Sequence, residues 1–579
     1  AEKPSVVKSV VEQRVKEETK DEDDKARSFL KETKVAEEVV HFFPEPSQIK
    51  EKIDKRAEQE KATSDEKARK FLDDTTMLGV ERRKFKSGLI PLVELFSKPH
   101  KDQVRISPKK TYIAWRSRGR SLADLQEDDN GVMNIFVKKL DTNKIRQITF
   151  YKEHDACVHY LFTPDDKSIV FLRETERGSE QYHLYAMEIE PFFDQDDESV
   201  NDPNIAPPAK PRNLIKDPNM TCGIGFAGGT QLWTSSESSP RQVYVSTSQI
   251  GPFAMFWDIS KVNIDTSKLT LVEQNRMSTS WGRFKVIFLT FIARILGYCC
   301  IKIKPPTIPI QWFPDNEFSF RGRLEIDLLD LGASFCARPM KSKTWKTIHA
   351  CSFEESNLQL IGSSGGSGTA RMEFDGDNIV DIHLCAFKSD NTTTYERFNI
   401  KSGQYLKRVA GGNAKSDITG FVTDPKTGKA QFVYYEYEKI EMEIIDAENS
   451  EQLDADIEYI KDFLEPSMTF QIVSRARSDE TWVLYAESGV GHSLFQGSPS
   501  AYFLFSRRAI EGGSGDYSFV EYSRNIELVF PSRPEMKKYK MARMDPVHVK
   551  ARDGEDILCY LSRVQPPSIR GRIEIPPGP

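Results

Sequence analysis

The segment Gly362–Gly366, with the sequence GSSGG, matches the pattern G-x-S-x-G in which a serine acts as a nucleophile. Ser364 would attack an acyl carbon after a histidine had taken its proton. That chemistry needs a buried strand before the serine and a helix after it. Here LQLIG precedes the motif, but SGTARMEF follows and alternates like a second strand. We therefore interpret Ser364 as a turn residue and expect no catalytic residue in the chain.

The remaining reactive side chains are scattered. His383, His492 and His548 follow the serine, but each lies in a strand-rich or linker context. The eight cysteines include no CxxC pair and no histidine at ligand spacing, so we expect free thiols and no metal. There is no phosphate-binding loop, no HExxH and no dinucleotide fingerprint. The sequence therefore predicts no cofactor.

The composition favours a large globular protein and argues against a nucleic-acid-binding one. The 579 residues are 38% hydrophobic and carry a formal net charge of −6, which supports large cores but gives no basic field for nucleic acid. Unpaired cysteines are typical of an intracellular, reducing compartment. The first residue is Ala1, which leaves a mitochondrion or plastid open as the location.

The first 99 residues differ from the rest in being rich in charge. DKARSFLKET (Asp24–Thr33) recurs 42 residues later as EKARKFLDDT (Glu66–Thr75). Each copy favours a short helix, and its apolar residues share one face. We interpret 1–99 as a charged helical arm whose KARxFLxxT copies dock on a protein partner, and a solvated leader is the alternative. The partner-binding residues expected are Arg27, Phe29, Leu30, Arg69, Phe71 and Leu72.

From about residue 100 to 560 the pattern changes to short β segments. VRISPKKTYIAW (Val104–Trp115) is echoed by YLFTPDDKSIVFL (Tyr160–Leu172), and both predict a strand, a Ser/Thr-Pro turn and a second strand. Similar units recur along the chain at intervals typical of propeller blades. The sequence predicts an all-β fold, a β-propeller of about seven blades after the charged α-helical arm. A proline-rich tail, 561–579, follows.

Three stretches in this order resemble a known family. RQITFYKEHDACVHYLFTPDDKSIVFLRETERGSEQYHLYAMEI resembles the propeller of the prolyl oligopeptidase family, especially its acylaminoacyl-peptidase-like branch. SMTFQIVSRARSDETWVLYAES and PVHVKARDGEDILCYLSRVQPP resemble the last blade and the crossing into the hydrolase domain. The resemblance implies that an α/β-hydrolase domain with the catalytic serine, aspartate and histidine would follow. We expect that domain to be absent from this chain.

The range 276–310 reads as an insertion between blades. Its segment FKVIFLTFIARILGYCCIKI (284–303) is apolar and carries a charge near its centre, which is costly in lipid. A helix buried against a partner protein, an interfacial membrane helix and a helix packed on the propeller remain open. The insertion residues expected to matter are Ile287, Leu289, Ile292 and Arg294.

Two functions compete at this level. In the first, the chain is a non-catalytic propeller descended from a serine peptidase, a structural and interaction subunit of a larger protein assembly. In the alternative, it is the substrate-gating half of such a peptidase, whose hydrolase domain lies outside this chain. The arm and the insertion favour the first function, because both add surface for partners and neither adds chemistry.

Overall fold

The computed structural model describes most of the chain beyond residue 98. The residues described are 90, 96, 99–118, 132–151, 157–174, 179, 181–194, 207–223, 231–234, 236–250, 256–298, 307–327, 332–352, 371–384, 392–412, 416–512, 519–539 and 541–562. The chain divides into two units, 1–89 and 90–579, and all described residues belong to the second. The expected helical arm lies outside them except for Ile90, Phe96 and Pro99, and the proline-rich tail lies outside them from residue 563 onward.

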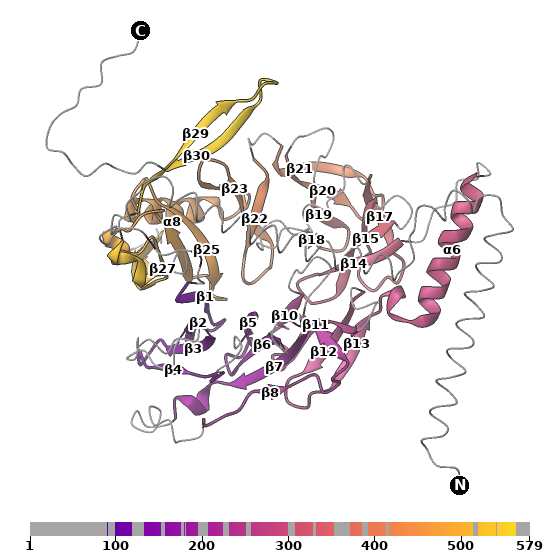
Figure 1. The fold of residues 1–579 in the computed structure, drawn as a ribbon, viewed down its shortest axis with the longest axis horizontal. Helices are drawn as coiled ribbons and strands as arrows, with labels where there is room; N and C mark the ends of the chain where they lie inside the picture. Colours follow the sequence, from indigo (N-terminus) through magenta and orange to yellow (C-terminus); the bar gives the residue numbers. More distant parts are fainter. Residues whose placement is uncertain are drawn as a thin grey trace, which may run out of the picture. The chain divides into compact units, whose positions relative to one another are not determined.

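Seven antiparallel sheets are arranged around a common axis as the blades of a β-propeller (Figure 1). The sequence-based prediction of about seven blades is therefore confirmed. Each sheet is built from strands that are consecutive in the sequence, and each blade begins at its innermost edge. Short hairpin turns can connect such strands, which explains why glycine and proline punctuate the sequence so regularly.

The first three blades occupy residues 101–273. Blade 1 contains β1 (Lys101–Ile106), β2 (Tyr112–Arg118), β3 (Met133–Lys139) and β4 (Ile145–Gln147). Blade 2 contains β5 (His159–Phe162), β6 (Ser168–Glu174), β7 (Tyr182–Glu188) and β8 (Arg212–Asn213). Blade 3 contains β10 (Leu232–Thr234), β11 (Gln242–Gln249), β12 (Asp258–Asn263) and β13 (Leu269–Glu273), and β9 (Met220–Cys222) pairs with β11.

The other four blades occupy residues 307–531. Blade 4 contains β14 (Thr307–Pro314), β15 (Phe320–Asp327), β16 (Ala333–Ala337) and β17 (Lys346–Cys351). Blade 5 contains β18 (Met372–Asp375), β19 (Ile379–Leu384), β20 (Thr394–Asn399) and β21 (Tyr405–Gly411). Blade 6 contains β22 (Ile418–Thr423), β23 (Ala430–Glu436) and β24 (Ile440–Ile444). Blade 7 contains β25 (Thr469–Arg475), β26 (Thr481–Glu487), β27 (Ser500–Gly512) and β28 (Phe519–Pro531).

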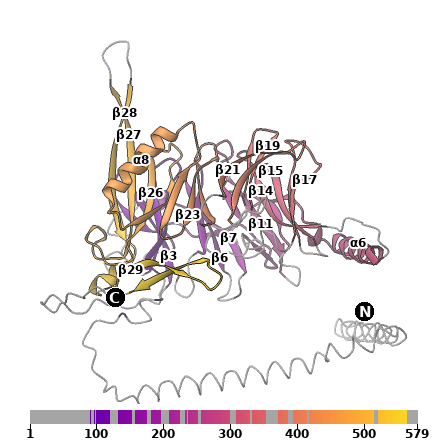
Figure 2. The ribbon, with the colours of Figure 1, turned by 90° about the horizontal axis from the view of Figure 1, so that it is seen from above.

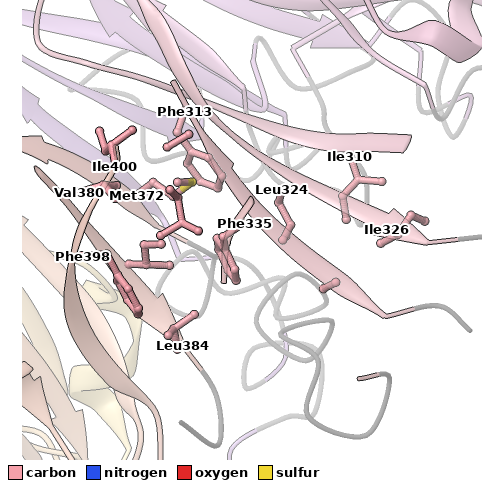
Figure 3. Close-up of a cluster of buried hydrophobic side chains, with 14 of the residues drawn as sticks. Ile310, Phe313, Leu324, Ile326, Phe335, Met372, Val380, Leu384, Phe398 and Ile400 are labelled. Carbon is pink, nitrogen blue, oxygen red and sulfur yellow. The ribbon is translucent and has the colours of Figure 1, made fainter. Parts of the chain in front are cut away.

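The blades are held together by apolar layers between neighbouring sheets. Figure 3 shows one such layer, in which Phe313, Leu324 and Phe335 of blade 4 meet Met372 and Phe398 of blade 5. The central strands supply most of these side chains because both of their faces are covered. The burial of β6 over Ser168–Leu172 is continuous for that reason, where a sheet exposed on one side would alternate.

Among the residues that the structure describes, the ring closes without a strand shared by its two ends. Blade 1 contains only β1–β4 and blade 7 only β25–β28. Trp115 and Val104 of blade 1 pack instead with Val483 and Phe530 of blade 7 in one apolar cluster. The backbone N–H of Arg477 also donates to the carbonyl of Pro108 at 2.9 Å. Closure therefore depends on side-chain packing and a few hydrogen bonds.

Two α-helices occur among the described residues, and both follow the outermost strand of a blade. Helix α6 (Ser280–Tyr298) follows β13, and helix α8 (Ser450–Phe463) follows β24, where the fourth strand of blade 6 would be (Figures 1 and 2). The expected insertion 276–310 contains α6, and β14 of blade 4 begins at Thr307. Short 3-10 helices are η1 (Glu190–Phe192), η3 (Arg276–Ser278), η5 (Ser493–Phe495) and η6 (Pro534–Lys538).

After blade 7 the chain forms a separate hairpin of β29 (Met544–Lys550) and β30 (Asp556–Ser562). It lies across one end of the blades, opposite the end toward which β27 and β28 project (Figure 2). Its contacts are with the turn between β23 and β24. The Tyr560 hydroxyl donates to the carbonyl of Tyr437, and His548 Nε2 lies 2.7 Å from a carboxylate oxygen of Glu438.

Candidate functional site

A cavity of about 660 Å³ lies on the axis of the ring. It is bounded by the innermost strands and by the first hairpin turn of most blades, so it opens at the turn end of the propeller. All seven blades contribute to its wall. One residue from each, in blade order, is Pro108, Pro164, Trp233, Trp312, Phe374, Phe421 and Arg475.

Charged side chains stand among these aromatic walls. Arg371 Nη2 donates to Glu373 Oε2 at 2.9 Å, and the Tyr395 hydroxyl donates to the same oxygen at 3.0 Å. Burial alone would lower the pKa of Arg371, but the neighbouring Glu373 and Tyr395 outweigh it and raise that pKa. Burial, together with Glu373, raises the pKa of Tyr395 far above its usual range. Arg371 therefore stays a cation and Tyr395 a neutral phenol near neutral pH.

Arg475 extends the charged wall into blade 7. Its Nη1 donates to Gln431 Oε1 of blade 6 at 2.6 Å, and its guanidinium lies over the ring of Trp482. Burial lowers the pKa of Arg475. Even so, an arginine pKa begins so high that the side chain remains charged. Its Nε donates to Asp479 Oδ1 at 2.7 Å, so the guanidinium is fixed and its charge is paired within blade 7.

The open end of the cavity is crossed by an ion pair. Arg477 Nε of blade 7 lies 2.9 Å from Glu237 Oε1 of blade 3. Blades 7 and 3 are three steps apart in one direction around the ring and four in the other, so this pair spans the axis. Both side chains are substantially exposed, at 39% and 57%. Such an exposed pair contributes at most about 1 kcal/mol, so it can obstruct the opening without holding the blades together.

Polar contacts between neighbouring blades make the turn end rigid. Asp166 of blade 2 accepts a hydrogen bond from Ser107 of blade 1 at 2.5 Å, and Arg241 of blade 3 donates to Ser168 of blade 2 at 2.6 Å. Arg321 of blade 4 similarly donates to a backbone carbonyl of blade 5 at 2.9 Å. The cavity wall is thus assembled by contacts between blades that are distant in sequence.

The hairpin β29–β30 contacts the other end of the propeller. The β22–β23 turn borders the cavity opening, so the β23–β24 turn, which the hairpin contacts, must lie at the opposite end. One face of the hairpin carries His548 and Tyr560, which contact Tyr437 and Glu438. The other face carries only one charged residue, Asp545. The rest of it is apolar, comprising Val547, Val549, Ile557, Cys559 and Leu561.

This second face, which we call the apolar hairpin face, is open to solvent. Val549 and Ile557 are each 49% exposed and Leu561 is 40% exposed. A two-stranded hairpin is marginally stable alone and is normally part of a larger sheet or covered by another layer. The apolar hairpin face therefore has the composition of a buried sheet surface.

The histidines considered in the sequence lie on three separate elements. His383 is buried in β19 against the ring of Phe421, and His492 Nε2 lies 3.0 Å from Glu465 Oε1. His548 lies in the hairpin, and Ser364 lies outside the described residues. Among the residues that the structure describes, no group of three or more His, Cys, Asp and Glu side chains could hold a metal ion.

The insertion residues singled out from the sequence lie on α6. Ile287 is 58% exposed and Leu289 is 40% exposed, whereas Ile292 is half-buried. Arg294 belongs to α6, but its side chain is outside the described part. The six expected docking residues of the arm also lie outside the described residues, so their role stays a prediction. Sequence reasoning missed the cavity residues Arg371, Glu373, Arg475 and Arg477.

Comparison with known proteins finds similar peptidases. The chain is 20% identical over 474 residues to dipeptidyl aminopeptidase BIII of Pseudoxanthomonas mexicana, covering 82% of this chain and 53% of that protein. It is 21% identical over 492 residues to dipeptidyl peptidase family member 6 of Caenorhabditis elegans, covering 85% and 53%. The chain is related to the dipeptidyl peptidases of the prolyl oligopeptidase family.

The match to these peptidases concerns their propeller portion. The chain spans about half the length of the curated relatives it matches, at 53% in both cases. The solved structure of Porphyromonas gingivalis dipeptidyl peptidase 4 covers 80% of this chain and 57% of its own, at 10% identity and a TM-score of 0.39. No family model matches the chain. The chain is therefore a β-propeller similar to part of the dipeptidyl peptidases that it matches.

Proposed function

We propose that this propeller controls substrate access in a serine peptidase of the dipeptidyl peptidase type. The observation that carries the proposal is the apolar hairpin face, led by Val549 and Ile557. In our proposal this face packs against a hydrolase domain that holds the catalytic serine, aspartate and histidine. The names of the two relatives support a peptidase, and the resemblance of 546–567 to the crossing into a hydrolase domain supports the position of the junction.

The axial cavity supplies the selecting element in this proposal. A peptide that enters from the turn end passes the Glu237–Arg477 pair before it reaches the aromatic wall. Arg371 and Arg475 offer hydrogen-bond donors to the carbonyl groups of an extended peptide, because their charges are already paired with Glu373 and Asp479. Opening the pair requires only the rotation of two exposed side chains. The cavity therefore admits narrow, extended peptides more readily than folded proteins.

The decisive experiment uses the native protein from its own source. A serine-directed fluorophosphonate probe is applied, and the labelled residue is located by mass spectrometry while dipeptide release from peptide nitroanilides is measured. We expect the label on a serine other than Ser364, in the polypeptide that carries this propeller or in an equimolar partner. The isolated chain 1–579 should remain unlabelled. A native protein that holds the propeller with no labelled component would contradict the proposal.

Matched variants of the active native protein test whether the apolar hairpin face packs against the hydrolase domain. Replacing Val549 and Ile557 with Asp should abolish dipeptide release, because charges on the apolar hairpin face prevent its burial. Replacing Leu271, which is 51% exposed on β13, with Asp is the control and should leave activity unchanged. Equal losses in the two variants would show that the hairpin has no special role.

The second candidate function is a non-catalytic structural subunit of a larger assembly. The exposed aromatic residues of α6 favour it, because they offer surface without chemistry. The same labelling experiment separates the two functions. A native assembly that contains the propeller, shows no serine labelling and releases no dipeptide would favour the structural subunit.

A further inference from the structure

Helix α6 presents a continuous apolar face to solvent. Five of its side chains recur at spacings of three and four residues, which places them on one side of a helix. We call this set the aromatic stripe. Its members and their exposed fractions are Trp281 at 72%, Phe284 at 58%, Ile287 at 58%, Phe288 at 50% and Phe291 at 61%.

The rings of the stripe are ordered against one another. The centroids of Trp281 and Phe284 lie 5.7 Å apart, and those of Phe284 and Phe288 lie 5.8 Å apart, both in stacked arrangements. Stacking along the helix fills the gaps between the rings without burying them. The stripe is therefore a preformed apolar surface that needs little rearrangement to be covered.

The opposite side of α6 fixes the direction of the stripe. Val286 is only 3% exposed and belongs to the apolar cluster shared by blades 4 and 5. Arg283 Nη1 donates to the carbonyl of Met277 at 3.1 Å. Gly282 allows this close approach, because a Cβ there would lie 1.8 Å from the carbonyl oxygen of Arg276. The helix cannot turn its stripe toward the blades without breaking these contacts.

The charged residues of the segment that carries the stripe have a single sign. From Gln274 to Pro314 the sequence contains no Asp or Glu and six basic residues. The whole chain has a net charge of −6, so this segment departs sharply from the rest. The six are Arg276, Arg283, Lys285, Arg294, Lys302 and Lys304. Arg276 and Lys285 have exposed side chains at the N-terminal end of the helix.

We propose that α6 is an in-plane anchor for anionic lipid, with the aromatic stripe inserted at the headgroup boundary of a membrane. Helices of this kind combine Trp, Phe and Leu on one face with Lys and Arg around it. The uniform positive charge selects an anionic bilayer surface, and Trp281 suits the interface because its ring has an apolar body and a polar N–H. Among the described helices, none is long and apolar enough to cross a membrane.

Vesicle flotation with the full chain tests the proposal. We expect binding to vesicles of phosphatidylcholine with about one third phosphatidylserine, and at least about tenfold weaker binding to phosphatidylcholine alone. Replacing Phe284 and Phe288 with Ser should weaken binding about tenfold or more, because both rings lose their burial in lipid. Arg276→Glu with Lys285→Glu should remove the preference for phosphatidylserine. Replacing Leu271 and Leu406, both exposed on outer strands, with Ser is the control and should leave binding intact.

A spectroscopic readout locates the contact. Binding should shift the tryptophan emission to shorter wavelength, and Trp281→Phe should remove most of that shift while binding persists. Failure of the unaltered chain to float with anionic vesicles would overturn the proposal. So would concentration-dependent self-association in the absence of lipid that the Phe284→Ser and Phe288→Ser changes abolish, since the stripe would then be a protein interface. The proposal is independent of the peptidase function.

Discussion

Helices α6 and α8 each follow the last strand of a blade, yet the apolar face of α8 is buried and that of α6 is exposed. In α8, Leu453, Ile457 and Ile460 are at most 4% exposed and pack with the aromatic core of blade 7. In α6 only Val286 is buried to that degree among the side chains described, and the aromatic stripe faces solvent. The presence of an apolar face therefore does not indicate whether a helix packs in the core or exposes that face as a binding surface.

The polar contacts of the two helices separate them further. Asp456 of α8 is fully buried and accepts hydrogen bonds from Arg507 of β27 and Arg524 of β28. Helix α6 is attached through its N-terminal turn and Val286. Helix α8 is thus part of the core between blades 6 and 7, whereas the contacts of α6 with the blades, among its described side chains, lie toward its N-terminal end. The following predictions test this difference between α8 and α6, from the largest expected effect on stability to the smallest.

Asp456→Ala should have the largest effect. It leaves Arg507 and Arg524 without their shared carboxylate in a buried site, which typically costs about 3–5 kcal/mol of the free energy of unfolding. Urea denaturation followed by circular dichroism measures the change. Glu458→Ala on the exposed side of α8 is the matched control and should change stability by less than about 0.5 kcal/mol. Equal effects would show that the buried carboxylate does not fix α8.

Ile460→Ala should come next. Ile460 is fully buried, and removing such a side chain costs about 2–4 kcal/mol through lost burial and the cavity left behind. The same denaturation measurement applies. A loss below about 1 kcal/mol would mean that α8 can close the gap and is held more loosely than its contacts indicate.

Val286→Ala should have an intermediate effect on stability. This is the one position where α6 resembles α8, but the surrounding helix is open on its other side and can settle into the space. We expect a loss of about 1–2 kcal/mol. Faster hydrogen exchange of 280–298, with the blades unchanged, would locate the loss in α6. Uniform acceleration of exchange in blades 4 and 5 would instead make α6 a structural part of the ring.

Phe288→Ala should have almost no effect on the folded chain. Its ring is 50% exposed and contacts mainly Phe284, so we expect a change within about 0.5 kcal/mol. Thermal unfolding of the isolated chain and of the Ile460→Ala variant, side by side, makes the comparison direct. A destabilisation as large as that of Ile460→Ala would show that the stripe is packed in solution.

The sequence predicted the blades because each carries its own local signal. Ser107-Pro108 and Thr163-Pro164 mark equivalent turns, and alternating strands flank them. Helix α8 was missed, although Leu453, Ile457 and Ile460 recur with helical spacing. The strand pattern on both sides concealed it. The residues between 276 and 310 were expected to interrupt the blades, but their exposure could not be inferred, because burial depends on which neighbours the fold supplies.

The cavity residues could not be predicted for a different reason. Glu237 and Arg477 are far apart in sequence and meet only because seven blades close into a ring. Arg371 and Glu373 look like ordinary strand residues, and their environment depends on Gly428 and Ala430 of the next blade. Contacts of this kind depend on the number of blades and the tilt between them, which no local pattern contains.

In the described part of the chain the ring closes without a shared strand, and this has a consequence for its architecture. The backbone N–H of Lys101, at the start of β1, donates to the carbonyl of Ser532, just after β28, at 3.4 Å. The two ends of the propeller therefore lie side by side while every sheet remains complete in itself. A circular permutant that joins these ends and opens between β4 and β5 would keep all seven sheets intact. The blade that comes first in the sequence therefore has no special structural role in this ring. The contact between blades 1 and 7 is one of seven contacts between neighbouring blades.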